Sequence, residues 1–282
     1  MWGYNEDMST IRTPVVAGAF YPGDQGALSA LLASLFSGKP IVDGQLSRPY
    51  GLIAPHAGYI YSGRVAADGY REVAKRGKPD AVIIIGTNHT GLGNPISIAQ
   101  TGVWRTPFGD VPVAAELADG LVKRGFPVAE EAFLREHSVE VQLPFIQYLF
   151  GPGVPFVPIC VMLPPLSDLI AAGEAIADVV QDEPILIVAS SDFTHYEPDS
   201  IARQLDMEAV DLILELDVAG FYNLVLKKRL SICGAGAITM LLAMAKRLNW
   251  KRADLVSYAT SGDVTGDRSA VVGYAAITIG TE

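Results

Sequence analysis

The four histidines of this 282-residue chain are the side chains best suited to chemistry. Three of them stand in short loops after apolar runs: His56 in Ala-Pro-His-Ala-Gly-Tyr, His89 in Gly-Thr-Asn-His-Thr-Gly and His195 in Asp-Phe-Thr-His-Tyr. The fourth, His137, lies in the polar segment Glu-His-Ser-Val-Glu. Ligands of α/β proteins bind where the loops after the strands converge on one edge of the sheet. The placement therefore predicts a single polar pocket and favours a metal site.

His56 is followed by Tyr59, Tyr61 and Ser62 in a turn that leads into an expected helix. A helix N-terminus favours anions, so the segment 61–63 could hold a carboxylate or phosphate group of a ligand. A histidine after a proline is more often a structural group. The sequence leaves both interpretations of His56 open.

His89 follows an apolar run and lies between Gly86 and Gly91. Glycine lets the backbone approach a ligand closely, which favours a ligand-binding loop. The alternative is a glycine-rich turn whose histidine caps a helix or binds water. A phosphate-binding P-loop is excluded because no Gly-Lys-Ser/Thr ends the segment.

Asp192 and His195 are three residues apart after another apolar run. If Asp192 begins a helical turn, both side chains project to one side. The carboxylate could then orient His195 as a general acid or base. A helix-capping role for Asp192 has equal weight.

A polar cluster is formed by Glu136, His137, Glu140 and Gln142, which alternate with apolar residues. On a helix, the two carboxylates would share a face with His137 beside it, so the cluster could hold a water or a metal. A solvated helix face is the alternative. Cys233 is the soft ligand available to such a site, and a thiolate near histidines favours a transition metal over magnesium or calcium.

A serine hydrolase is the rival interpretation, since Ser190, Ser191, Asp192 and His195 supply the residue types. They lie too close in sequence for a triad on three separate loops, and no Gly-x-Ser-x-Gly turn is present. The other cysteine, Cys160, lies in an apolar run and is expected to be an inert core thiol.

The elements that position these residues alternate between strand and helix. Strands are expected at 51–54, 81–85, 156–163, 185–189, 254–259 and 270–279, and helices at 27–36, capped by Asp24, and at 62–75, 110–125, 167–181, 200–216, 218–228 and 235–248. A further helical segment after His137 is expected to be interrupted by Pro144. This order predicts one three-layer α/β domain, residues 1–282, with helices on both faces of a mixed, mostly parallel sheet. The last two strands are expected to pair antiparallel because their connection is too short for a crossover helix.

Composition narrows the function classes. The net charge is −10, with no extended basic cluster, which argues against nucleic-acid binding. No apolar run is long enough to span a membrane, and the polar, acidic N-terminus lacks a signal-peptide pattern, which predicts a cytoplasmic protein. Two cysteines do not form a disulfide framework.

Six motifs, in order along most of the chain, resemble those of the Memo family, known in prokaryotes as AmmeMemoRadiSam system protein B. They are Ala-Gly-Ala-Phe-Tyr-Pro-Gly at 17–23, Ala-Pro-His-Ala-Gly-Tyr-Ile-Tyr-Ser-Gly at 54–63, Gly-Thr-Asn-His at 86–89, Glu-His-Ser-Val-Glu-Val-Gln-Leu-Pro at 136–144, Ser-Ser-Asp-Phe-Thr-His at 190–195 and Ile-Cys-Gly at 232–234. The resemblance implies a fold similar to the class III extradiol, LigB-type dioxygenases, which hold non-haem iron with two histidines and a carboxylate.

Carried onto this sequence, the resemblance places the metal ligands at His56, His89 and Cys233. It places Asp192 and His195 at other pocket positions and His137 at a further one. A thiolate where the dioxygenases use a glutamate argues against ring cleavage. The small residues 234–237 that follow the cysteine imply a more open pocket.

Two functions from different classes follow. The first is an iron-dependent redox or oxidoreductase-like protein acting on an unknown small molecule, with His195 as acid or base and with His137 and Glu140 shaping the cavity. Copper is the alternative metal, and zinc would instead imply hydrolysis. The second is a binding module without chemistry, which would use Tyr59, Tyr61 and the region of Ser62 to recognise a peptide or a partner. The radical-SAM and AMMECR-type proteins with which the family is grouped would be such partners.

Overall fold

An eight-stranded sheet forms the centre of the molecule in the computed structural model, which describes residues 11–42 and 44–281. Its strand order is β10 (Arg252–Thr260), β11 (Val271–Gly280), β2 (Tyr50–Ala54), β8 (Ile185–Ser190), β3 (Ala81–Thr87), β7 (Phe156–Val161) and β4 (Ile96–Ile98), with β9 (His195–Glu197) paired to β11 off this path. A smaller sheet contains β1 (Ile11–Arg12), β5 (Val103–Thr106) and β6 (Gly109–Pro112).

The middle of the large sheet is parallel and the two sides are antiparallel. Strands β2, β8, β3 and β7 run in one direction, and every residue in them is buried. Such unbroken apolar runs are typical of parallel strands that are covered on both faces. Strands β10 and β11 pair antiparallel, as expected from their short connection, which contains the single turn α9 (Gly262–Thr265).

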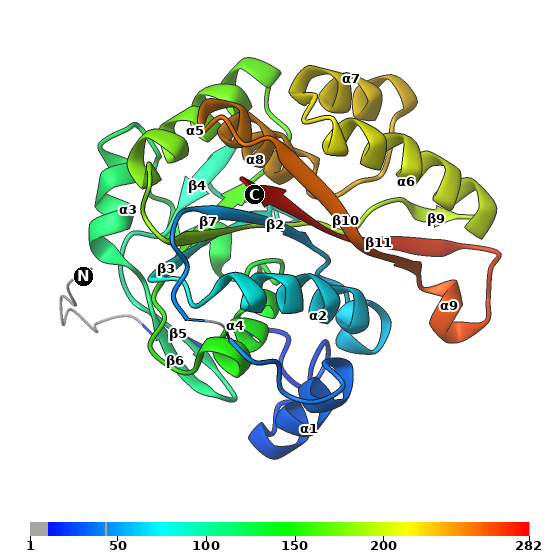
Figure 1. The fold of residues 1–282 in the computed structure, drawn as a ribbon, viewed down its shortest axis with the longest axis horizontal. Helices are drawn as coiled ribbons and strands as arrows, with labels where there is room; N and C mark the ends of the chain where they lie inside the picture. The colour runs from blue at the N-terminus through cyan, green and yellow to red at the C-terminus, as the bar shows by residue number, and fades with distance from the viewer. Residues whose placement is uncertain (1–10, 43, 282) are drawn as a thin grey trace.

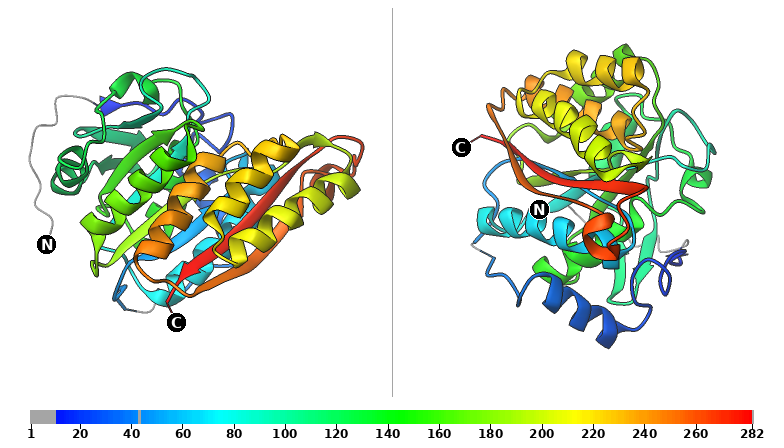
Figure 2. Two further views of the ribbon diagram at one scale, coloured as in Figure 1. Left: turned by 90° about the horizontal axis from the view of Figure 1, so that it is seen from above. Right: turned by 90° about the vertical axis from the view of Figure 1, so that its right-hand side faces the viewer.

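Helices cover both faces of this sheet (Figure 1). On one face lie α2 (Tyr59–Arg76) and α4 (Leu143–Phe150), with α1 (Gln25–Leu35) outside them. On the other lie α3 (Ala115–Val122), α5 (Leu166–Val180), α6 (Asp199–Leu214), α7 (Val218–Lys228) and α8 (Ala235–Arg247). The two views of Figure 2 show the resulting three layers, and the expected three-layer α/β architecture is confirmed.

Two local predictions were wrong. The expected helix at 110–125 begins only at Ala115, because Gly109, with φ +107°, turns the chain into the hairpin of β5 and β6. Pro144 does not interrupt a helix but stands in the first turn of α4, where its missing N–H would have no partner in any case. The expected cap on α1 is present, since Asp24 accepts a hydrogen bond from the Ala27 amide at 2.8 Å.

The parallel strands bring the candidate residues to one edge. β2 is followed by His56, β3 by His89 and β8 by Asp192, and all three strands are neighbours in the sheet. Loops at the carboxyl ends of adjacent parallel strands converge, which is where α/β folds bind ligands. In the described part of the chain, no helix has the length and the apolar composition needed to cross a bilayer.

Candidate metal centre

Three histidines from separate segments meet at this edge of the sheet. The ligand atoms of His56, His89 and His137 all lie within 4.8 Å of one another, so the three side chains could hold a metal ion. His137 reaches the site because its segment packs against β3, where a Cβ on Gly86 would lie 2.5 Å from the Ser138 hydroxyl. The absence of a side chain at Gly86 therefore makes room for the segment around Ser138 and not for a ligand.

A buried carboxylate orients His89. Glu136 is fully buried and accepts hydrogen bonds from His89 Nδ1 at 2.9 Å, from the His89 amide at 2.7 Å, and from the amides of His137 and Ser138 at 2.9 Å. A proton on Nδ1 leaves Nε2 of His89 as a free acceptor. This arrangement, a carboxylate behind a histidine, fixes the tautomer that binds metal.

A serine hydroxyl orients His56 in the same way. Ser190 Oγ lies 3.0 Å from His56 Nδ1, donates to the Ser138 carbonyl at 2.7 Å and accepts from Gln142 Nε2 at 2.8 Å. Because a hydroxyl has one proton, and that proton goes to Ser138, Nδ1 of His56 must be the donor to Ser190. Nε2 of His56 is therefore also a free acceptor.

The electrostatic surroundings keep the centre ready for a cation. Burial, with repulsion from His137 and His89, lowers the pKa of His56, and burial also lowers the pKa of His137. Burial opposes ionisation of Glu136, but its hydrogen bonds and the charge of His89 prevail and lower its pKa to about 2. Neutral imidazoles at His56 and His137 beside an ionised Glu136 are protonation states that favour metal binding.

The ring planes distinguish the third histidine from the other two. The His56 ring is perpendicular to those of His89 and His137, at 87° and 89°, whereas the His89 and His137 rings are stacked at 4.7 Å with 16° between their planes. The lone pair of a ring nitrogen lies in the ring plane, so one ion cannot lie in both stacked planes unless a ring turns. Phe20 packs on the His137 ring at 4.8 Å.

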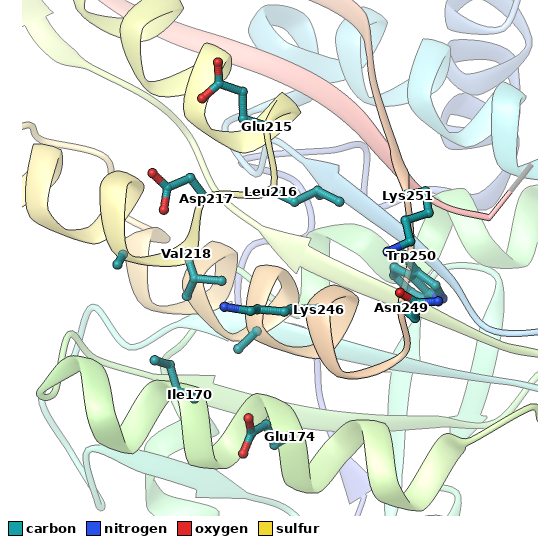
Figure 3. Close-up of a pocket in the computed structure, with 12 residues that line it drawn as sticks. Ile170, Glu174, Glu215, Leu216, Asp217, Val218, Lys246, Asn249, Trp250 and Lys251 are labelled. Carbon is teal, nitrogen blue, oxygen red and sulfur yellow. The ribbon is translucent and has the colours of Figure 1, made fainter.

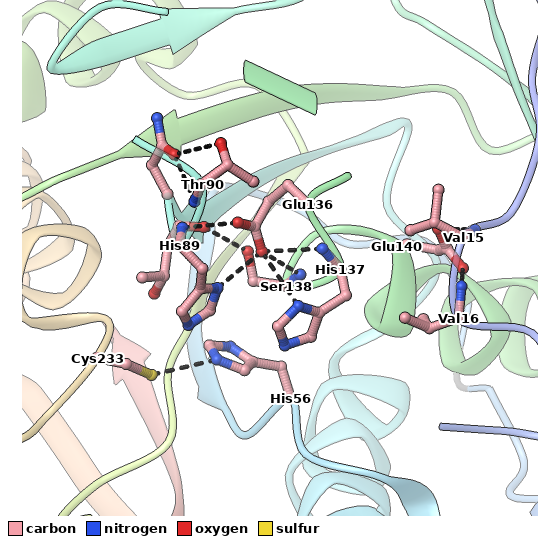
Figure 4. Close-up of polar contacts among 12 residues, drawn as sticks. Val15, Val16, His56, His89, Thr90, Glu136, His137, Ser138, Glu140 and Cys233 are labelled. Atoms are coloured by element: carbon pink, nitrogen blue, oxygen red, sulfur yellow. Dashed lines mark hydrogen bonds and ion pairs between the residues drawn. The ribbon is translucent and has the colours of Figure 1, made fainter. Parts of the chain in front are cut away.

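Cys233 adjoins the centre on the side of His56. Its Sγ lies 3.2 Å from His56 Nε2 (Figure 4). The same Sγ accepts from the Asp192 amide at 3.3 Å. Burial, and next the charge of Asp192, raise the pKa of the thiol to about 12. The protonated thiol has two acceptors within reach, Nε2 of His56 at 3.2 Å and the Asp192 carbonyl oxygen at 3.5 Å.

Asp192 and His195 are both near the centre but do not form the expected pair. No helical turn begins at Asp192, whose Oδ1 accepts from the backbone amide of His56 at 2.8 Å and fixes that loop. The His195 ring is held instead by Ser231, whose carbonyl oxygen lies 2.8 Å from Nδ1 and whose hydroxyl accepts from the His195 amide at 2.7 Å. A carbonyl can only accept, so Nδ1 of His195 carries the proton of this hydrogen bond.

Glu140 does not shape the cavity as predicted. It is fully buried, and its carboxylate is occupied by Arg12 at 2.8 Å, by Tyr21 Oη at 2.8 Å and by the amides of residues 15 and 16. The two glutamates of the polar cluster do not share a helix face, because the segment is irregular up to the 3-10 helix Glu140–Gln142.

The predicted recognition residues of α2 are also occupied. The helix begins at Tyr59, so the amides of Tyr61 and Ser62 are bonded to the Gly58 carbonyl and are not free to hold an anion. The Tyr59 hydroxyl donates to the Val141 carbonyl at 2.6 Å inside the core, and the Ser62 hydroxyl donates to the Ala57 carbonyl. Of these side chains, Tyr61 is the one that is exposed.

The expectation of a more open pocket after Cys233 was wrong. A Cβ on Gly234 would lie 2.4 Å from Cβ of Ser191, and one on Gly236 would lie 2.1 Å from the Met162 carbonyl oxygen. Glycine is needed at these two positions because the start of α8 packs directly against the ends of β7 and β8. They close the wall behind the thiol rather than widen it.

The serine hydrolase interpretation finds no support in the contacts. The Ser190 hydroxyl donates to a backbone carbonyl, and the Ser191 hydroxyl donates to the Asp192 carbonyl while accepting from the Gly234 amide. Cys160 is buried in β7 as expected, and burial raises its pKa.

Sequence reasoning missed the roles of Ser190 and Ser231, which orient His56 and His195. Nothing in their own positions marks them, since serines beside strand ends are common. The motif Glu-His at 136–137 carried a usable signal, because a carboxylate next to a histidine is a frequent partner of metal ligands.

A cavity of about 560 Å³ lies elsewhere, between α5, α8 and the connection of α6 to α7. Figure 3 shows Lys246 between the carboxylates of Glu174 and Asp217. These charged side chains are exposed, and no histidine is among the lining residues. Exposed, solvated charges account for this groove. The candidate site is therefore identified by the converging nitrogen atoms of the histidines and not by the volume of a cavity.

Comparison with known proteins agrees with this geometry. The family model described as "Memo-like protein" matches residues 12–278. A "MEMO1 family protein" of Desulfurococcus amylolyticus is 44% identical over 277 residues, covering 94% of this chain and 98% of that protein. One of Methanosarcina acetivorans is 43% identical, covering 95% and 99%. The crystal structure of the uncharacterized protein JW3007 from Escherichia coli K12 superposes with a TM-score of 0.58 at 14% identity, over 83% of this chain and all of that one, which shows a shared fold.

Proposed function

The chain belongs to the Memo-like protein family, and from this premise we propose that it binds a redox-active transition metal through His56, His89 and Cys233. Iron is the proposed ion, with copper as the alternative and zinc as the less favoured one. The proposed role is oxidoreductase-like, on a small molecule that enters beside the ion. The observation that carries the proposal is the convergence of ring nitrogens from His56, His89 and His137 within 4.8 Å of one another, with Cys233 Sγ at 3.2 Å from His56 Nε2.

The donor set fits such an ion. Sγ of Cys233 and Nε2 of His56 lie 3.2 Å apart, close enough that both would be able to bind one ion. Imidazole and thiolate ligands suit iron and copper better than magnesium or calcium. When bound, the metal would supply a Lewis acid with accessible oxidation states.

The remaining residues would handle the proton and the position of the substrate. Ser231 holds Nδ1 of His195 at 2.8 Å and keeps the ring in place. Nε2 of His195 is therefore the atom that would exchange a proton with a bound molecule. His137, beside His89, would be able to join the ion after its ring turns.

Metal titration of single variants tests the ligand set. Anaerobic calorimetry with Fe(II) should give one site per chain, and the affinity should fall by more than about 100-fold in His56→Ala, His89→Ala and Cys233→Ser. His137→Ala should lose less than Cys233→Ser. Lys246→Ala, in the distant groove, is the matched control and should bind as the wild type does.

The outcomes separate the alternatives. Unchanged affinity in Cys233→Ser together with full loss in His137→Ala would replace the thiol by the third histidine. Metal binding with no redox turnover, joined to capture of a radical-SAM or AMMECR-type protein, would favour the binding-module alternative.

A further inference from the structure

Asp206 is a fully buried carboxylate on α6, outside the cluster of histidines. Its Oδ1 accepts a hydrogen bond from the Thr194 amide at 3.0 Å, and its Oδ2 accepts from the Tyr258 hydroxyl at 2.6 Å. Burial raises the pKa of Asp206, because these neutral donors do not fully replace the water that the carboxylate has lost. Features that cost stability in this way are expected where a function needs them.

The chain is built closely around this carboxylate. α6 packs on β9, β10 and β11 (Figure 1), and Tyr258 is a residue of β10. On β11, a Cβ on Gly273 would lie 1.9 Å from Oδ2 of Asp206. The absence of a side chain at Gly273 therefore makes room for the carboxylate beside the backbone of Thr194.

Thr194 stands directly before His195, and the chain is fastened at this point. The Phe193 amide donates to the Gly273 carbonyl at 2.8 Å, and the Gly273 amide donates to the Thr194 carbonyl at 2.9 Å. Asp206 adds a side-chain contact to this backbone pairing, at the Thr194 amide. The carboxylate therefore helps to set where the next residue, His195, leaves the loop.

Tyr196, the residue after His195, has a strained backbone. Its φ of +64° lies in a region that a bulky side chain rarely adopts. In the pairing of β9 with β11, His195 is opposite Val272 and Glu197 is opposite Val271, so Tyr196 is the extra residue of a β-bulge. A bulge can re-aim a neighbouring side chain, and a strained conformation persists where the surrounding structure holds it.

The bulged strand brings His195 to Ser231. The His195 amide donates to the Ser231 hydroxyl at 2.7 Å, and Nδ1 of the ring lies 2.8 Å from the Ser231 carbonyl oxygen. A neutral ring with its proton on Nδ1 presents a lone pair at Nε2. The placement of the strand therefore decides which nitrogen of His195 is available to a bound molecule.

We propose that Asp206 is a positioning residue for His195. It holds the Thr194 amide, and this contact keeps the bulged strand in the form that brings the His195 ring to the Ser231 carbonyl. Asp206 acts through the backbone and is not itself the acid or base. The inference rests on the proposed function only for the purpose of this placement, which is the exchange of a proton at Nε2 of His195.

The tautomer of His195 tests this role. Long-range proton–nitrogen NMR correlations of the full, metal-free chain distinguish a proton on Nδ1 from one on Nε2, and His195→Gln identifies the signals. The spectra are taken at about pH 8.5, roughly two units above the ordinary pKa of histidine. Wild type should favour the Nδ1-protonated form at least about tenfold, as expected for one hydrogen bond. Asp206→Ala should lose this preference and shift toward the Nε2-protonated form, which a free histidine side chain favours.

Two further variants separate this role from a general loss of stability. Asp206→Asn keeps an oxygen that can accept from the Thr194 amide, so it should keep the Nδ1-protonated form. Tyr258→Phe removes the other hydrogen bond of the same carboxylate and should lower the melting temperature, but it should also keep that form. If Asp206→Ala does not fold, Asp206→Leu takes its place, since leucine fills the volume without supplying an acceptor.

An unchanged tautomer in the variant without the acceptor would overturn the proposal, as would a wild type that does not favour Nδ1 or an equal loss in Tyr258→Phe. If neither Asp206→Ala nor Asp206→Leu folds, hydrogen exchange in the wild type decides. The Thr194 amide should then exchange as slowly as the amides of β11, and fast exchange would overturn the proposal.

The tautomer is measured without metal, so its outcome is separate from the metal titration. A chain that binds no iron but shows the Asp206-dependent tautomer contradicts the proposed function alone. A chain that binds iron and keeps the tautomer in Asp206→Ala contradicts this inference alone.

Discussion

Glu136 and Glu140 are two buried carboxylates four residues apart, and they serve different regions of the molecule. Each is fully buried, and each accepts four hydrogen bonds. The partners of Glu136 are the amides and the ring of the histidine centre. The partners of Glu140 are Arg12, Tyr21 and the amides of residues 15 and 16. Figure 4 shows the contacts with residues 15 and 16.

The comparison shows that burial and a full set of hydrogen bonds do not by themselves mark a functional group. The two glutamates accept the same number of hydrogen bonds, but the residues that they hold have different roles. The partners of Glu136 can bind a metal, whereas those of Glu140 attach residues 12–21 to the domain. The region of Glu136 should therefore respond to substitution in metal affinity, and the region of Glu140 in stability.

The largest expected effect is on stability, in Glu140→Ala. Removal of the carboxylate leaves the largely buried guanidinium of Arg12 without its ion pair, and breaking a buried pair costs about 3–5 kcal/mol. Urea unfolding should show this loss, while Fe(II) affinity measured on the folded protein should stay within about threefold of wild type. A large loss of metal affinity at unchanged stability would erase the distinction between the two glutamates.

Acid should weaken the Glu136 region in a defined pH range. The folded-state pKa of about 2 lies below the ordinary value of 4.5, so the ionised Glu136 stabilises the fold fully above about pH 4.5. This stabilisation, at most roughly 3 kcal/mol, is lost as the pH falls toward 2. The unfolding free energies of metal-free wild type and Glu136→Gln should therefore differ most at pH 6, differ less at pH 3 and converge only near pH 2. A difference that does not change with pH would show that Glu136 acts through packing alone.

The fold and the histidines could be predicted from the sequence because their signals are local. The runs 81–85 and 185–189 are apolar throughout, which specifies buried parallel strands, and parallel strands specify where the loops with His56 and His89 meet. The partners of those histidines could not be predicted. Whether Asp192 or Ser231 holds His195 depends on which loops touch across 36 residues of sequence.

The polar cluster at 136–142 shows the same limit. A helical pattern predicted that its two glutamates would act together, but a close approach of the chain at Gly86 holds the segment in an irregular form. Spacing along the chain carries no information about that contact. The fold was therefore predictable at the level of layers and strand ends, and the candidate site only at the level of the histidines that converge there.

After the two stability effects, the next largest expected effect is a loss of metal affinity in Glu136→Gln. A neutral amide can still receive some of the four bonds, but it holds His89 less firmly and lowers the basicity of the ring. Loss of such a supporting carboxylate typically weakens metal binding by about 10–100-fold. Calorimetry with Fe(II) should show this loss, with Glu140→Gln as the matched control at near wild-type affinity. Equal losses in the two variants would contradict the division between the regions.

The smallest effect should come from Tyr21→Phe, which removes one of the four bonds to Glu140. The Tyr21 hydroxyl donates to Glu140 Oε1 at 2.8 Å, and a single buried bond of this kind contributes about 0.5–1.5 kcal/mol to stability, or up to about 3 when its partner is charged. Urea unfolding measures the cost in wild type and again in the Glu140→Gln background. Because the bond joins the two side chains directly, the cost should shrink in that background, and metal affinity should not change in either. An equal cost in both backgrounds would mean that Tyr21 stabilises the protein through its ring, packed 5.4 Å from Tyr59, and not through Glu140.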